Sequence, residues 1–288
     1  MILALTLGMG LLIGLSLGAL GGGGSILTVP ALVYVIGQGA KAATTSSLFI
    51  VGISSLIGAL GHHRSGRVRW STGLIFGVTG IAASLAGTAA NRLVQPDVLL
   101  LAFAVLILVA AAGMFAKTRT PAHHAEPART HVPAGTGVDP ASPPGPSVLA
   151  PDLDQPAPRR AWNWRRAGKV LTAGLAVGFM TGFFGVGGGF VIVPALTLAL
   201  GMAMPEAVAT SLVVIAINSA AALAFRAGSA HFDWAVIAPF TAAAIAGSLA
   251  GKQVADRLNA RTMTRAFAVL LVAVAVYTAT QSVLGLLG

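Results

Sequence analysis

The sequence contains no cysteine and very little charge. Without cysteine there can be no disulfide, no thiolate metal ligand and no cysteine nucleophile. Asp, Glu, Lys and Arg make up 9% of the 288 residues, whereas soluble domains carry about 25%. The composition is 56% hydrophobic with a mean hydropathy of +0.84, and apolar runs long enough to cross about 30 Å of hydrocarbon recur along the chain. We therefore expect an all-α polytopic membrane protein.

Carboxylates are the scarcest charged groups, with 8 Asp and Glu against 18 Lys and Arg. No carboxylate lies in the middle of an apolar run. Four carboxylates lie near the ends of apolar runs: Asp97, Glu206, Asp233 and Asp256. Proton-driven transporters commonly place such a group within the membrane. We therefore do not expect coupling through a buried carboxylate, and Glu206 at its helix start is the nearest candidate. The histidines beside the apolar runs are interpreted as ordinary interfacial loop residues: His62, His63 and His231.

The same absences argue against catalysis and nucleic-acid binding. An intramembrane enzyme needs a constellation at depth, such as two aspartates or a serine near a histidine. The interiors of the apolar runs contain neither acids nor histidines, so we expect no enzyme, no cofactor and no metal site. The net charge of +10 lies almost entirely between apolar runs, where basic residues are typical of cytoplasmic loops. Nucleic acid is therefore not an expected partner.

What the chain has in abundance is glycine, and part of that glycine belongs to an internal repeat. Residues 18–32 read GALGGGGSILTVPAL, and residues 182–196 read GFFGVGGGFVIVPAL. The same spacing of 164 positions aligns two further pairs of segments: 84–87 with 248–251, and 102–106 with 266–270. A duplicated unit whose glycine cluster interrupts an apolar segment is typical of membrane transporters.

Each copy of the repeat contains five apolar segments. In the first copy, residues 1–116, the segments are 2–20, 25–37, 42–61, 71–92 and 97–116. In the second copy, residues 168–288, they are 168–184, 189–201, 206–226, 234–255 and 261–285. The linker between the copies, residues 117–167, holds 10 of the 15 prolines and is expected to be a disordered cytoplasmic segment.

Two arguments about the orientation of the copies conflict. In the first copy, basic residues crowd the loop after the third segment: Arg64, Arg67 and Arg69. In the second copy, they lie around the loop after the fourth segment: Lys252, Arg257, Arg261 and Arg265. By the positive-inside rule, this shift indicates an inverted repeat with an odd number of crossings. The short segment 25–37, however, covers only about 20 Å. If that segment is re-entrant, the copies are parallel with four crossings each. We favour inversion.

The two glycine clusters are candidate parts of a binding site. Four consecutive glycines cannot hold a stable helix, since each costs about 1 kcal/mol relative to alanine. A helix that restarts at Ser25 or Gly189 would present free N–H groups and a positive dipole end within the membrane, which is an anion site made from backbone. The alternative is that the glycines only allow tight helix packing. Two symmetric clusters favour contact with a substrate.

Hydroxyl groups open the third segment of each copy, at residues 44–47 and at Thr210 and Ser211. They can cap their helices or supply neutral donors beside the glycine breaks, and Asn218 can do the same from deeper in its helix. The candidate substrate-binding residues are therefore Gly21, Gly23, Gly24, Ser25, Thr45, Ser46, Gly185, Gly187, Gly188, Gly189, Thr210, Ser211 and Asn218.

The chain resembles the TauE/SafE-type sulfite exporters, also called the 4-toluene sulfonate uptake permease family. The resemblance lies in the twin glycine breaks that end in Pro30 and Pro194, in the Thr/Ser-rich starts at 43–46 and 209–211, and in the loops 63–70 and 228–234. It covers nearly all of the chain except the linker. Two departures are Arg69, where an acid is expected, and the long proline-rich linker.

The resemblance implies a secondary transporter of small anions in the bacterial cytoplasmic membrane, with sulfur oxyanions or organosulfonates such as sulfite or sulfoacetate as substrates. The expected partners are therefore a small anion and the lipid bilayer. The alternative is a membrane assembly or sensor protein without transport. The two symmetric glycine breaks count against that alternative. A protein that only assembles or senses has no need for a glycine break in the equivalent helix of each copy.

Overall fold

The computed structural model describes residues 2–91, 93–94, 96–119, 164–184, 189–226 and 232–287, and these residues form helices joined by short loops. In chain order they are α1 (Ile2–Leu20), α2 (Gly23–Pro30), η1 (Ala31–Val35), α3 (Ala40–His63), α4 (Trp70–Asn91), α5 (Pro96–Arg119), α6 (Trp164–Phe184), α7 (Gly189–Pro194), η2 (Ala195–Ala199), α8 (Met204–Arg226), α9 (Trp234–Arg257) and α10 (Ala260–Leu287). No strand occurs in these ranges, so the expected all-α fold is confirmed. Six of the helices are long and apolar enough to cross a membrane by length and composition: α1, α3, α4, α6, α8 and α9.

The second segment of each copy is a short α-helix followed by one π-helical turn. The turns η1 and η2 begin directly after Pro30 and Pro194, because proline has no N–H to donate and disturbs the regular bonding pattern. Each short helix then ends at a glycine with positive φ, Gly37 at 82° and Gly201 at 65°. The local structure therefore repeats with the same spacing of 164 positions as the sequence.

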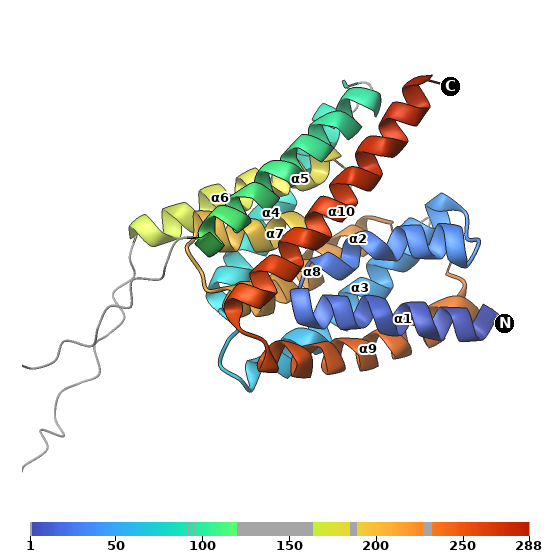
Figure 1. Ribbon diagram of the computed structural model, residues 1–288, viewed down its shortest axis with the longest axis horizontal. Helices are drawn as coiled ribbons and strands as arrows, with labels where there is room; N and C mark the ends of the chain where they lie inside the picture. Colours follow the sequence, from blue (N-terminus) through green and yellow to red (C-terminus); the bar gives the residue numbers. More distant parts are fainter. Residues whose placement is uncertain are drawn as a thin grey trace, which may run out of the picture.

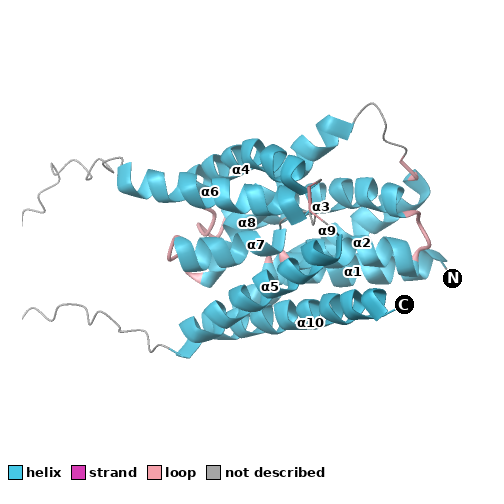
Figure 2. Ribbon diagram, turned by 90° about the horizontal axis from the view of Figure 1, so that it is seen from above, coloured by secondary structure: helices cyan, strands magenta, loops and turns pink. Residues whose placement is uncertain are grey.

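The two copies are interlocked. The first helix of each copy packs against the fourth helix of the other, α1 against α9 and α6 against α4, while α3 packs on α8 and α5 on α10. Small residues allow these close approaches: a Cβ on Gly14 would overlap the backbone carbonyl of Ala244, and a Cβ on Gly178 would overlap the backbone of Gly80. Figures 1 and 2 show α5 and α10 side by side, across the ends of the shorter elements.

Equivalent helices of the two copies run in opposite directions. In the α3–α8 contact, Gly52 faces Ser219 and Gly58 faces Leu212, so these helices are antiparallel. Accordingly, α1 begins and α10 ends at one end of the molecule, whereas α5 ends and α6 begins at the other (Figures 1 and 2). The structure contains no membrane, so inverted orientation in the bilayer remains a prediction, which these directions support.

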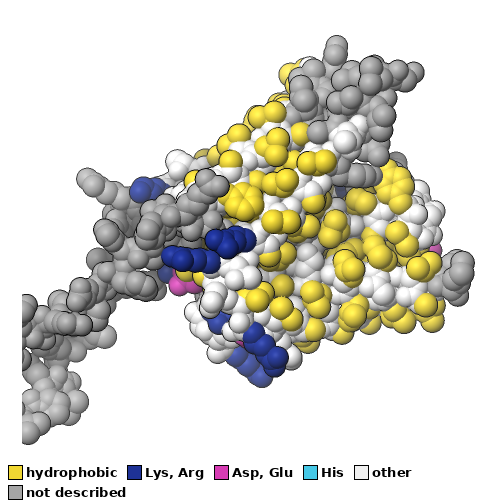
Figure 3. Space-filling view, in the orientation of Figure 1, with side chains coloured by type: hydrophobic (Ala, Val, Ile, Leu, Met, Phe, Trp, Pro, Cys, Tyr) yellow, Lys and Arg dark blue, Asp and Glu magenta, His cyan; other side chains and the backbone are white. Residues whose placement is uncertain are grey.

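Apolar side chains cover the visible face of the molecule, and Lys and Arg gather toward the end where α6 begins (Figure 3). The helix directions bring the basic residues of the α3–α4 and α9–α10 loops to that end, together with Lys169 near the start of α6. We call it the basic end. Exposed leucines and valines on α1 and α4 are suited to lipid contact: Leu3, Leu11, Leu12, Leu74, Val78 and Leu85.

One histidine differs from the expectation. His62 belongs to the last turn of α3 and is only 1% exposed, so its interpretation as an interfacial loop residue is wrong. The next residue, His63, is exposed and accepts a hydrogen bond at Nδ1 from Trp70 Nε1 at 2.9 Å. The two histidines differ in burial because the side of α3 that carries His62 packs on α1 and α9, whereas the side that carries His63 does not.

Candidate functional site

The first glycine break is formed by two residues rather than four. Gly21 has a φ of 70° and donates its N–H to the Leu17 carbonyl at 2.7 Å, which ends α1 in the left-handed conformation that glycine favours. Gly22 then caps α2 without a side-chain hydrogen bond. The helix restarts at Gly23, two residues earlier than expected. Identical neighbouring glycines carry no signal for which of them breaks the helix.

This break touches the start of the equivalent short helix in the other copy. A Cβ on Gly22 would overlap the carbonyl oxygen of Gly189, and one on Gly189 would overlap Ser25 Oγ. A Cβ on Gly21 would lie 2.5 Å from Ser211 Oγ. The structure therefore brings Gly21, Ser25, Gly189 and Ser211 together. The other predicted glycines of the second break, Gly185, Gly187 and Gly188, lie outside the described residues.

Two serines occupy equivalent positions in the third helices of the copies. Ser211 donates to the Val208 carbonyl and Ser47 to the Thr44 carbonyl, both at 2.8 Å. Each hydroxyl oxygen keeps acceptor capacity after donating. Ser47 and Gly22 were not among the residues predicted for the site. The spacing of 164 positions pairs Ser47 with Ser211, so a strict alignment of the copies finds Ser47 from the sequence.

Two of the predicted residues pack against helices of the scaffold instead. A Cβ on Gly23 would lie 2.6 Å from Leu270 Cδ2 of α10, and one on Gly24 would lie 2.6 Å from the Ile13 carbonyl oxygen of α1. These glycines therefore let α2 lie close to its neighbours.

The predicted polar residues of α3 and α8 are mostly buried. Thr45 and Ser46 are buried in α3, and Ser46 Oγ has no hydrogen-bond partner. Thr210 is fully buried and accepts a hydrogen bond from the Arg69 N–H at 3.2 Å, so it anchors the α3–α4 loop. Asn218 Oδ1 is buried in the middle of α8 without a partner and lies beside Gly80.

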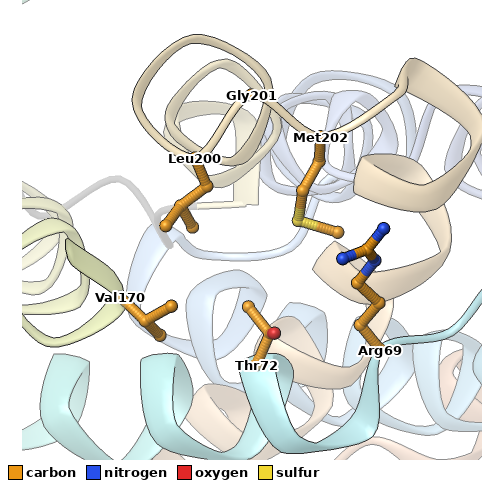
Figure 4. A pocket seen from close by; sticks show the side chains of 6 residues that line it. All are labelled: Arg69, Thr72, Val170, Leu200, Gly201 and Met202. Atoms are coloured by element: carbon orange, nitrogen blue, oxygen red, sulfur yellow. The ribbon is translucent and has the colours of Figure 1, made fainter. Parts of the chain in front are cut away.

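A small cavity of about 80 Å³ opens at the basic end. It lies between the starts of α4 and α6 and the loop before α8, and its lining is Arg69, Thr72, Val170, Leu200, Gly201 and Met202 (Figure 4). The guanidinium of Arg69 also pairs with Glu206 of α8 at 2.7 Å. Glu206, the nearest candidate for a coupling carboxylate in the sequence, is thus half of an ion pair.

The electrostatics of the break favour a negatively charged ligand. The first N–H groups of α2 and α7 have no partner within their own helices, and the aligned peptide dipoles place positive charge at both starts. Ser25 and Ser211 add hydroxyl groups to the same contact. Within the described part of the chain, no group of three or more His, Asp or Glu residues could hold a metal ion. Both hydroxyls donate to backbone carbonyls, Ser25 to Gly22 at 2.7 Å and Ser211 to Val208 at 2.8 Å, so the donors that this arrangement offers to an anion are backbone N–H groups.

A glycine break that meets the start of the equivalent short helix, between interlocked helical repeats, is typical of membrane transporters built from repeats. The comparisons identify the family: the model described as Sulfite exporter TauE/SafE matches residues 6–278. The chain belongs to this TauE/SafE family and is a multi-pass membrane transporter. The family resemblance drawn from the sequence is thereby confirmed.

Curated relatives agree with this assignment. A "Probable membrane transporter protein" of Xylella fastidiosa (strain 9a5c) is 30% identical over 278 residues, which cover 96% of this chain and 94% of the relative. "Probable membrane transporter protein YunE" of Bacillus subtilis (strain 168) is 23% identical over 270 residues, covering 91% and 90% of the two chains. No solved structure matches the chain significantly.

Proposed function

We propose that the protein carries small anions, of the sulfur oxyanion or organosulfonate class, through a site at the meeting point of the glycine breaks. The observation that carries the proposal is the contact of Gly21 and Gly22 with Gly189 and Ser211, which joins the two copies at the starts of their short helices. An anion there would be held by backbone N–H groups without a buried cation, and the hydroxyls of Ser25 and Ser211 would join them by turning away from the carbonyls of Gly22 and Val208. The family description, sulfite exporter, supports this substrate class.

The inverted repeat is part of the same proposal. Equivalent helices that run in opposite directions let the copies exchange conformations, which supplies an inward-facing and an outward-facing state around one fixed site. The cavity beside Arg69 would then be the cytoplasmic vestibule of that site. The Lys and Arg side chains that gather at this end (Figure 3) would raise the local concentration of anions.

The proposal is tested by flux of ³⁵S-sulfite and ¹⁴C-sulfoacetate into proteoliposomes that contain the purified protein. Ser211→Ala and Ser47→Ala should each raise the KM about fivefold, because a lost hydrogen bond costs about 1 kcal/mol. Ser65→Ala in the exposed α3–α4 loop is the control and should leave the KM unchanged. Absence of flux for both anions would favour the alternative of an assembly or sensor protein, and an unchanged KM in both serine variants would move the site elsewhere.

A further inference from the structure

His62 differs from every other buried polar side chain that the structure describes. The buried polar residues are otherwise serines and threonines, and His62 is the one titratable group among them. Its equivalent in the second copy is Arg226, which is exposed at the end of α8. The transporter therefore has a buried titratable group in one copy that the other copy does not match.

The hydrogen bond of His62 fixes its tautomer. Nε2 lies 3.3 Å from the carbonyl oxygen of Gly18 in α1. A carbonyl can only accept, so Nε2 carries the hydrogen and Nδ1 carries the free lone pair of the neutral ring. Nδ1 is buried and has no partner. This nitrogen is therefore an empty proton acceptor inside the protein.

A column of polar side chains runs past His62 along the interface of α3 and α9. Ser248, Lys252 and Asp256 are spaced four residues apart, so they share one face of α9. This face meets α3 at and just before His62: Ser248 Oγ faces Gly58, one turn before the histidine, and the Lys252 side chain faces Gly61, the residue next to it.

Towards the middle of the molecule, Ser54 and Ser55 lie about two turns before His62 in α3. Their hydroxyl oxygens, like that of Ser248, are buried without a hydrogen-bond partner. Unpaired buried hydroxyls are costly, and in proteins such groups are satisfied by ordered water. The column is thus suited to conduct protons through hydroxyls and water.

At its outer end the column opens at the basic end of the molecule. Asp256 is exposed there and pairs with Arg67 of the α3–α4 loop and with Lys252 at 2.8 Å. Lys252, Asp256 and Arg67 are the charged groups that act on His62, and on the α1 side it meets the Gly18 carbonyl. One carboxylate and two cations therefore stand between His62 and the solvent at this end.

His62 is also linked to the glycine break. Its partner Gly18 lies in the last turn of α1, and that turn ends where Gly21 donates to Leu17. A positive charge on the ring strengthens the Nε2–H bond to the carbonyl, since charge-assisted hydrogen bonds are about twice as strong as neutral ones. Protonation therefore tightens α3 against the end of α1, three residues before the break.

We propose that His62 is the proton-binding residue of the transporter and that one proton, bound at Nδ1, moves with the transported anion. The proton reaches Nδ1 from the basic end past Asp256 and Lys252 and leaves it towards Ser248 when the molecule changes state, while Nε2 keeps its hydrogen. The imidazolium formed in this way offsets one negative charge of the anion. This inference rests on the proposed transport of small anions.

The test separates coupling from transport in proteoliposomes loaded with a pH-sensitive dye. Wild-type protein should accumulate ¹⁴C-sulfoacetate or ³⁵S-sulfite in response to a pH gradient, and an anion gradient should in turn move protons. His62→Gln should lose both effects, down to the level of protein-free liposomes. It should keep counterflow, the exchange of labelled for unlabelled anion at equal pH, because exchange needs no net proton transfer. His63→Gln, at the exposed neighbour, should behave like wild type.

Each outcome of this test either supports or overturns the role of His62. Gradient-driven accumulation by His62→Gln at the wild-type level, or wild-type anion flux without proton movement, would overturn the proposal. If His62→Gln fails to insert, Ser248→Ala must slow gradient-driven accumulation while sparing counterflow, and an equal loss of both would overturn the assignment. Absence of counterflow in the wild type would instead reject the proposed anion transport itself, and this inference with it.

Discussion

At the scale of single residues, the structure separates two roles that glycine plays in this chain. Gly21 is needed for its positive φ, whereas Gly22 is needed because a carbonyl of the other copy lies where a Cβ would be. Both residues belong to one run of four identical glycines. The sequence therefore predicted the break but could not say which glycines form it.

Gly22→Ala tests the contact between the copies. The new Cβ would overlap the backbone of Gly189, so α2 and α7 must separate, and we expect a loss of about 1–3 kcal/mol in unfolding free energy. Thermal unfolding in detergent measures this loss. Gly8→Ala is the matched control, because nothing lies within 4 Å of its Cβ and alanine is the better helix former. Equal melting temperatures for the two variants would refute the close approach.

At the scale of elements, the equivalent helices α4 and α9 start differently. Asp233 caps α9 by accepting a hydrogen bond from the Ala235 N–H at 3.2 Å. Arg69 stands at the equivalent position before α4, and its side chain has no acceptor with which to cap a helix. Its backbone N–H donates to Thr210, and its guanidinium pairs with Glu206. Arg69, which stands where the family resemblance led us to expect an acid, therefore does not cap α4. Instead it links the α3–α4 loop to α8.

Substitution of Asp233 measures how much its helix cap contributes to the free energy of unfolding. Asp233→Ala should lower the unfolding free energy by about 1 kcal/mol, whereas Asp233→Asn should change it little because asparagine caps equally well. Thermal unfolding of the two variants under identical detergent conditions is the measurement. If both variants lose the same stability, the negative charge rather than the cap is what stabilises α9.

The number and position of the elements could largely be predicted from hydrophobicity and the repeat. The expected segments 71–92 and 234–255 correspond within two residues to α4 and α9. The π turns after Pro30 and Pro194 were not predicted, because no local pattern distinguishes them from a continuing α-helix. The burial of His62 was also missed, since it depends on α1 and α9, which are distant in sequence.

At the scale of the whole molecule, the copies should label from opposite sides of the membrane. Gly39 and Ala203 are equivalent, exposed residues of the loops before α3 and α8. Gly39 has an extended backbone with open space around its Cβ, and the chain has no other cysteine. In intact cells, an impermeant maleimide should label Gly39→Cys but not Ala203→Cys. Labelling of both from the same side would show that the copies are parallel.

The exchange of partners between the copies also has a consequence for biosynthesis. The main partner of helix α1 is α9, which begins more than 200 residues further along the chain. The glycines of α1 therefore face the lipid or the insertion machinery until α9 has been made. Contacts between segments so distant in the chain form slowly and leave unpaired surfaces exposed meanwhile. The first copy therefore has no finished structure of its own to adopt before α9 joins it.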